Sequence, residues 1–256
     1  MISKDLIAKT FSYFKQFKNE NVVISPSIPI LYFGDLDQYR KSPLKIITVG
    51  KNPSNNEFRL KKNDKYSFVR FPKWNEDEKN LIETLNDYFE EEPLKSWFSS
   101  FEPILNGLNA SYYQGSRINT AVHTDICSPL ATDPTWSKLN ENERDLFFKE
   151  GLSIWKQLIE ELEPDIMLVS FRKDIFNAVF NSLGKELLAI ENKKNGEKRK
   201  FPYRVSLHEY PLKSKTVSVL FGDAANKPFD TISEIQKLEI GVKYRAHFND
   251  PASMRK

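Results

Sequence analysis

Five neutral polar side chains follow strand-like or turn-forming segments and are the residues best suited to chemistry: Asn52, Ser54, Asn119, His208 and Asn226. Such groups are poor nucleophiles, but they can position a water molecule. An asparagine amide also carries an acceptor and a donor side by side, so it can pair with the edge of a nucleobase. These residue types indicate hydrolysis at, or recognition of, a heterocyclic base.

Other common chemistries lack their sequence signatures. No second glycine follows Gly50 within the span that a phosphate-binding loop requires, so ATP and NAD sites are not expected. His123 and Cys127 lack the Cys-x-x-Cys partner of a deaminase zinc site. No Gly-x-Ser-x-Gly elbow supplies a hydrolase nucleophile. The sequence therefore predicts neither a metal nor another cofactor.

The composition is that of a globular protein with a wet surface. The 256 residues are 39% hydrophobic and 29% charged, and the formal charge of +3 permits an anionic partner without demanding one. Cys127 is the one cysteine, so no intramolecular disulfide can form. No apolar stretch approaches the ~20 residues of a membrane helix. We expect a cytoplasmic monomer.

Strand-like and helical patterns alternate along the chain. Buried-strand signatures cover residues 44–49, 117–122, 165–170 and 216–221, and helical patterns include 76–89, 94–108 (kinked or split at Pro103), a helix capped by Asn140 with Glu143, and 229–238. Asn195-Gly196 predicts a hairpin with a basic tip between runs 186–192 and 200–207. The pattern favours one three-layer α/β/α domain, residues 1–256, with a mainly parallel central sheet. Residues 1–40 would form an N-terminal packing segment and 41–240 the core.

Ligands of open parallel sheets bind where the carboxyl ends of the strands deliver their loops. Three loops meet that description: 50–58, 119–136, and either 208–214 or 222–228. The sequence therefore predicts the site among these loops.

Four segments, taken in order, resemble the uracil-DNA glycosylase superfamily. Residues 44–54, which end Val49-Gly50-Lys51-Asn52-Pro53-Ser54, look like its first motif, as in the mismatch-specific and single-strand-selective branches. Residues 118–124 are similar to the strand whose asparagine reads a pyrimidine, and 165–170 and 220–226 resemble later strands. The resemblance covers roughly residues 40–240 and implies the fold of that superfamily.

The resemblance also assigns roles. Asn52 would hold the hydrolytic water beside the sugar C1′, within a substrate-contacting segment that includes Gly50 and Lys51. Asn119 would read the flipped base, and an aromatic would stack on it, with Tyr66 the first choice and Phe68 the second. Ser54 stands where strict uracil enzymes carry a bulky residue, which leaves room for a 5-substituted pyrimidine.

One part of the family pattern is missing, because this chain has no His-Pro-Ser tripeptide. Either His208 or Asn226 would then act on the leaving base. Lys227, together with Lys198 and Arg199 of the basic hairpin tip, would contact DNA phosphates.

We therefore expect a monofunctional DNA glycosylase that excises uracil, mismatched thymine or a modified pyrimidine such as a phage base, in DNA repair or antiviral defence. The alternatives are a non-catalytic nucleic-acid binding module of the same fold and a hydrolase of free nucleosides. Asp133 and Trp136 lie in a long loop near the predicted site, and no role is assigned to them.

Overall fold

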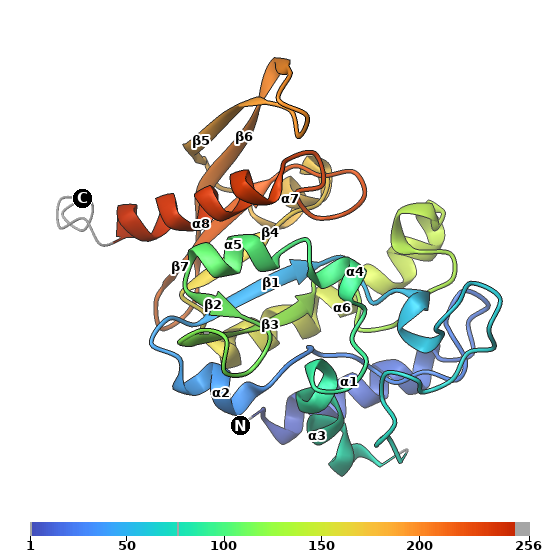
Figure 1. The fold of residues 1–256 in the computed structure, drawn as a ribbon. Coiled ribbons are helices and arrows are strands. Elements are labelled where there is room, and N and C mark those ends of the chain that lie inside the picture. Colours follow the sequence, from blue (N-terminus) through green and yellow to red (C-terminus); the bar gives the residue numbers. More distant parts are fainter. Residues whose placement is uncertain (1, 76, 249–256) are drawn as a thin grey trace. The chain divides into compact units, whose positions relative to one another are not determined.

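The computed structural model describes residues 2–75 and 77–248 and shows an α/β protein (Figure 1). Its sheet has the strand order β2-β3-β1-β4-β7-β6-β5. β2 pairs parallel with β3 and β4 with β7, whereas β6 pairs antiparallel with both β7 and β5. The strands are β1 Ile46–Gly50, β2 Ala110–Ser111, β3 Asn119–Asp125, β4 Ile166–Val169, β5 Lys185–Asn192, β6 Lys198–Pro211 and β7 Thr216–Gly222. The predicted α/β class with a mostly parallel sheet is confirmed.

Helices precede and connect the strands. The α-helices are α1 Lys4–Phe17, α2 Leu36–Lys41, α3 Leu81–Asn86, α4 Lys95–Phe98, α5 Glu102–Gly107, α6 Glu141–Leu162, α7 Lys173–Val179 and α8 Glu234–Phe248. Short 3₁₀ helices are η1 Asn55–Phe58, η2 Glu78–Asn80, η3 Asp87–Phe89 and η4 Trp136–Lys138. Among the described residues, no helix has both the length and the apolar character that crossing a membrane requires.

The chain forms two compact units, each assembled from three separate stretches. Unit 1 comprises Met1–Asp37, Val49–Leu94 and Val122–Glu163, and unit 2 comprises Gln38–Thr48, Lys95–Ala121 and Pro164–Lys256. The boundary falls within β1 and within β3, so each of these strands begins in unit 2 and ends in unit 1. The loops that follow the two strands therefore belong to unit 1.

Unit 1 contains the helix pair α1 and α6. Asn140 and Glu143 form the predicted capping box of α6, in which each side chain accepts from the other residue's backbone N–H. The buried Tyr13 of α1 donates from its hydroxyl to the Phe147 carbonyl at 2.9 Å. This hydrogen bond satisfies the one polar atom of a ring that otherwise belongs to the core.

Unit 2 contains β4, whose four residues are all buried, and the helix pair α5 and α8 (Figure 1). A Cβ on Gly107 would lie 2.4 Å from the Leu238 carbonyl oxygen, and one on Gly241 would lie 2.2 Å from that of Ile104. The two helices therefore approach so closely that only glycine fits at either contact.

Several element boundaries differ from the sequence prediction. The helix predicted over 76–89, whose first residue lies outside the described residues, is replaced by η2, α3 and η3. The pattern over 94–108 splits into α4 and α5, with Pro103 in the first turn of α5. Proline fits a first turn because the N–H it lacks would have no helical partner there. The last helix begins at Glu234, later than expected, and β3 begins at Asn119 and runs on to Asp125.

Candidate functional site

The loop after β1 is fixed in unit 1 by the residues that follow β3. All five residues of β1 are buried. The carbonyl of Gly50 accepts from Ile126 N at 3.0 Å, and that of Lys51 accepts from Cys127 N at 2.7 Å. Because these two backbone hydrogen bonds fix Gly50 and Lys51, the segment from Gly50 to Ser54 starts at a fixed position within unit 1.

Two hydrogen bonds fix the orientation of the Asn52 side chain in this loop. Its Nδ2 donates to the Leu130 carbonyl at 3.2 Å and to Thr132 Oγ1 at 2.9 Å. Leu130 and Thr132 are fully buried, whereas Asn52 is half-buried. Both amide donors are used, and none of the hydrogen bonds described for this side chain uses Oδ1. Asn52 therefore presents a fixed carbonyl oxygen that can accept a hydrogen bond from water.

A buried histidine and aspartate lie against Gly50. His123 Nε2 is 3.6 Å from Asp125 Oδ1, and both side chains are almost entirely buried. A Cβ on Gly50 would lie 2.4 Å from Asp125 Oδ1 and 2.9 Å from His123 Nε2. The absence of a side chain at Gly50 thus lets two titratable groups reach the carboxyl end of β1.

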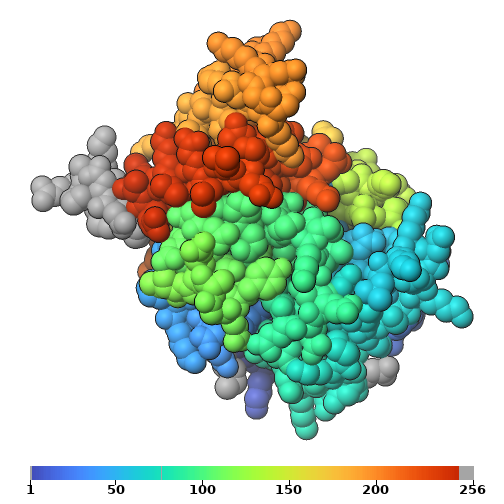
Figure 2. All heavy atoms as spheres, viewed as in Figure 1, coloured from blue at the N-terminus to red at the C-terminus, as the bar shows by residue number. Residues whose placement is uncertain are grey.

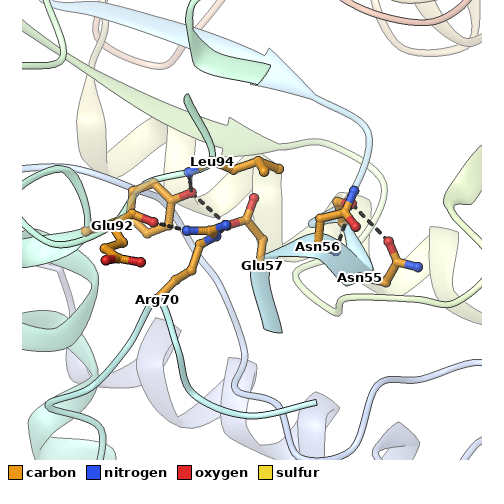
Figure 3. A network of polar contacts seen from close by, with 8 residues as sticks. Asn55, Asn56, Glu57, Arg70, Glu92 and Leu94 are labelled. Atoms are coloured by element: carbon orange, nitrogen blue, oxygen red, sulfur yellow. Dashed lines mark hydrogen bonds and ion pairs between the residues drawn. The ribbon is translucent and has the colours of Figure 1, made fainter. Parts of the chain in front are cut away.

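Glu57, in η1, is a second buried acid (Figure 3). Tyr88 Oη donates to its Oε2 at 2.7 Å, and Arg70 Nε lies 3.6 Å from the same oxygen. Figure 3 also shows Arg70 donating to the Glu92 carbonyl and Leu94 N donating to the tyrosine hydroxyl. Burial raises the pKa of Glu57 to about 7, against the lowering effects of Tyr88 and Arg70.

Tyr66 contacts Asp133, the loop residue to which the sequence assigned no role. Its hydroxyl donates to Asp133 Oδ2, and Arg59 lies 5.2 Å from the ring centroid. The hydrogen bond from Tyr66 holds the pKa of Asp133 below its usual value. Phe68 packs edge-on against the buried Phe58 at 6.4 Å. A guanidinium thus lies over the ring of Tyr66, and Phe68 contacts the core.

Lys51 and Ser54, the other predicted residues of the first motif, make hydrogen bonds within unit 1. Lys51 Nζ donates to Ser137 Oγ, and Ser54 Oγ accepts from Asn56 N at 3.1 Å as the cap of η1. The Ser54 side chain therefore serves the turn that brings Glu57 into the core.

The surroundings of Asn119 differ from those expected of a residue that reads the base. It is the first residue of β3 and lies in unit 2, whereas His123 and Asp125 occupy the carboxyl half of that strand. Its Oδ1 accepts from Leu44 N at 3.0 Å and its Nδ2 donates to the Asn109 carbonyl at 3.1 Å. The side chain is 5% exposed. This amide is used to satisfy backbone groups, so its geometry does not support base recognition.

His208 lies on β6 in unit 2 and is mostly buried. Its Nε2 is 2.8 Å from Ser206 Oγ and its Nδ1 is 3.1 Å from Ser182 Oγ. Burial lowers its pKa. Both ring nitrogens have serine partners, which is the environment of a packed histidine. The other predicted residues of unit 2, Asn226, Lys227 and Lys198, are exposed, and Arg199 is half-buried.

In comparisons with known proteins, no protein-family model and no curated protein matches this chain. Over residues 2–75 and 77–248, no three histidine, cysteine, aspartate or glutamate side chains gather so that they could hold a metal ion.

Within unit 1, the structure therefore places His123 and Asp125 against Gly50, two residues before Asn52, and it buries Glu57 in η1. Of these five residues, the sequence selected only Gly50 and Asn52. The signal for His123 and Asp125 was the polar run His123-Thr124-Asp125 at the end of a strand. Glu57 gave no signal, because an isolated glutamate in a polar loop is usually exposed.

Proposed function

We propose that this chain is a monofunctional DNA glycosylase of the uracil-DNA glycosylase type. It would hydrolyse the N-glycosidic bond of a flipped uracil, mismatched thymine or modified pyrimidine and leave an abasic site, in DNA repair or antiviral defence. The observation that carries the proposal is Asn52. It follows a buried strand, both its amide donors are bonded to buried partners, and its Oδ1 remains to accept from water.

The chemistry needs one water molecule and no cofactor. The C1′–N bond breaks and its electron pair leaves with the base, so positive charge develops on the sugar. The water held by Asn52 Oδ1 forms the new C1′–O bond and releases a proton, which the departing base anion takes up. A fixed acceptor helps because the water is already placed when the sugar cation forms.

We assign His123 to the charge that develops on the base, in place of His208 or Asn226. His123 lies against Gly50 in the same unit as Asn52, and its Nε2 lies 3.6 Å from Asp125 Oδ1. The ring nitrogens of His208, by contrast, are occupied by Ser182 and Ser206.

The test is excision from defined DNA. The purified chain is incubated with single-stranded and duplex DNA carrying uracil, mismatched thymine, 5-hydroxymethylcytosine or its glucosylated form, and alkali then cleaves any abasic site. Asn52→Ala should lower the rate at least a hundredfold, while the exposed neighbour Asn56 provides a matched control as Asn56→Ala. Binding without cleavage of any substrate would favour the binding module, and consumption of free nucleosides alone would favour the nucleoside hydrolase.

A further inference from the structure

A small pocket of unit 1 lies between α1, residues 18–27 and residues 68–74. Its volume is about 300 Å³, which is at the lower end of the range for small-molecule sites. Figure 2 shows the chain around residues 60–70, in cyan, at the surface of the molecule, where it leads into the third of these segments. The pocket therefore has room for one small molecule.

Aromatic side chains from two of the three segments line the pocket: Phe11 and Phe14 of α1, and Phe68 and Trp74. Phe11 is buried and stacks on Trp74, with 6.2 Å between the ring centroids and 25° between the ring planes. Phe14, Phe68 and Trp74 are only half-buried. The core thus fixes the Trp74 ring while part of the aromatic surface stays open, which suits a flat ligand.

The wall formed by residues 24–27 is also held in place. Ile24 N donates to the Ala131 carbonyl at 3.0 Å, and the buried Ser27 donates from Oγ to the Ile24 carbonyl at 2.5 Å. The pocket is therefore formed before any ligand binds, and a preformed pocket lowers the entropic cost of binding.

Polar side chains line the same pocket and are exposed to solvent: Lys18 at the end of α1, and Asn19 and Ser25 of the loop that follows. None of the hydrogen bonds and ion pairs described within the chain uses these three side chains. An asparagine amide offers a donor and an acceptor side by side, so Asn19 can pair with the edge of a base.

The charges of the lining favour an anion. Lys15 and Lys18 both line the pocket, and none of its described lining residues is acidic. Lys15 Nζ lies 3.3 Å from Glu78 Oε1, so its charge is already partly balanced. Lys18 is then the cation that a ligand can use. A cationic ligand, which aromatic rings can also hold, would be repelled here.

We propose that this pocket binds a nucleoside monophosphate: the base stacks on Trp74, Asn19 pairs with the edge of the base, and Lys18 holds the phosphate. Such a ligand uses every feature of the lining, because it combines a flat ring, polar ring edges and an anionic group. A single nucleotide is favoured over a strand because the pocket has the volume of one small ligand. This binding site goes beyond the proposed glycosylase and does not depend on it.

Calorimetric titration of the full chain with dAMP tests the site, since dAMP carries no pyrimidine to excise. Trp74→Ala should weaken binding about tenfold, as expected for loss of one base–aromatic stack, and Trp74→Phe should retain most of it. Lys18→Gln should weaken dAMP binding about threefold, the effect of one exposed ion pair, and leave deoxyadenosine binding unchanged. Asn19→Ala alters an exposed side chain outside the core and should weaken both ligands alike.

The matched charge control is Lys156→Gln on α6, which removes an exposed lysine of the same unit that does not line the pocket. This variant should bind dAMP like the unchanged chain. The proposal is overturned if dAMP shows no binding up to about 1 mM, if Trp74→Ala binds it unchanged, or if Lys18→Gln keeps the preference for dAMP over deoxyadenosine. Binding of oligo(dA) without binding of dAMP would assign the pocket to a DNA strand and overturn it as well. Each of these results stands whether or not the chain excises a base from DNA.

Discussion

At the scale of single residues, the proposed water site depends on how Asn52 is held. Thr132→Val keeps the shape of a fully buried side chain but removes the hydroxyl that accepts from Asn52. We expect kcat to fall about tenfold with KM little changed, because the loss of one hydrogen bond of about 1 kcal/mol frees the amide to rotate. Thr132→Ser restores the hydroxyl and should recover most of the rate. Equal kcat for the valine and threonine forms would remove Thr132 from the site.

The raised pKa of Glu57 predicts that the stability of the chain depends on pH. Its pKa is about 7 in the folded chain, against 4.5 for an unperturbed carboxyl, so the folded state holds a proton that the unfolded state releases earlier. The free energy of unfolding should therefore fall by roughly 3 kcal/mol as pH rises from about 4.5 to 7, and stay lower above that. Glu57→Gln imitates the protonated form and can still accept from Tyr88.

Urea unfolding at pH 5.5 and pH 8 measures this dependence. The Glu57→Gln chain should lose the Glu57 contribution to the pH slope and should be the more stable of the two chains at pH 8. If both chains show the same slope, Glu57 is already ionised at neutral pH and its charge is balanced by Arg70.

At the scale of elements, the junction between the ends of β1 and β3 depends on the missing side chain of Gly50. In Gly50→Ala the new Cβ would meet Asp125 Oδ1 and His123 Nε2 well inside contact distance. We expect a loss of about 1–3 kcal/mol in stability, as for other overpacked sites, together with loss of activity. Asp125→Ala in the same background opens space and should recover stability without recovering activity. No loss of stability in the single variant would show that the two side chains move aside freely.

The helices and strands also show which parts of the fold can be predicted from the sequence. Capping and apolar periodicity are local signals, and they predicted α6 and the buried strands correctly. The position of Asn119 was not predictable in this way, because a strand pattern does not say where hydrogen bonding begins. The strand runs to Asp125, so His123 and Asp125 reach Gly50 while Asn119 is left at the other end. Which end of a strand meets a neighbouring loop is decided by register, a tertiary property.

Neither the burial of Glu57 nor the exposure of Phe201 could be predicted from the local sequence pattern. Nothing in the local sequence marks Glu57 as buried, and its partners in the core, Tyr88 and Arg70, come from later segments of the chain. An aromatic residue in a strand pattern is expected to pack, and Phe201 is exposed because the pairing of β5 and β6 is irregular. Burial of this kind follows from contacts that local patterns do not encode.

At the scale of the whole molecule, β1 and β3 each run through the boundary between the two units without a break. Loss of either unit would remove hydrogen-bonding partners from a strand that the other also uses. We therefore expect one cooperative unfolding transition rather than two. Cys127 offers a probe, because it is the chain's one cysteine, it is fully buried in unit 1, and burial raises its pKa. Its thiol should resist labelling until unit 1 unfolds.

The measurement compares two midpoints in urea: labelling of Cys127 after a short pulse, and far-ultraviolet circular dichroism, which reports the helices and strands of both units. Coincident midpoints would mean that the shared strands couple the units, so a destabilising change in unit 2 would also expose the thiol in unit 1. Gly241→Ala supplies that change, because its Cβ would meet the Ile104 carbonyl at 2.2 Å within unit 2. If labelling in this variant stays at the original midpoint while circular dichroism splits into two steps, the units unfold independently. The site residues of unit 1 would then persist when unit 2 has unfolded.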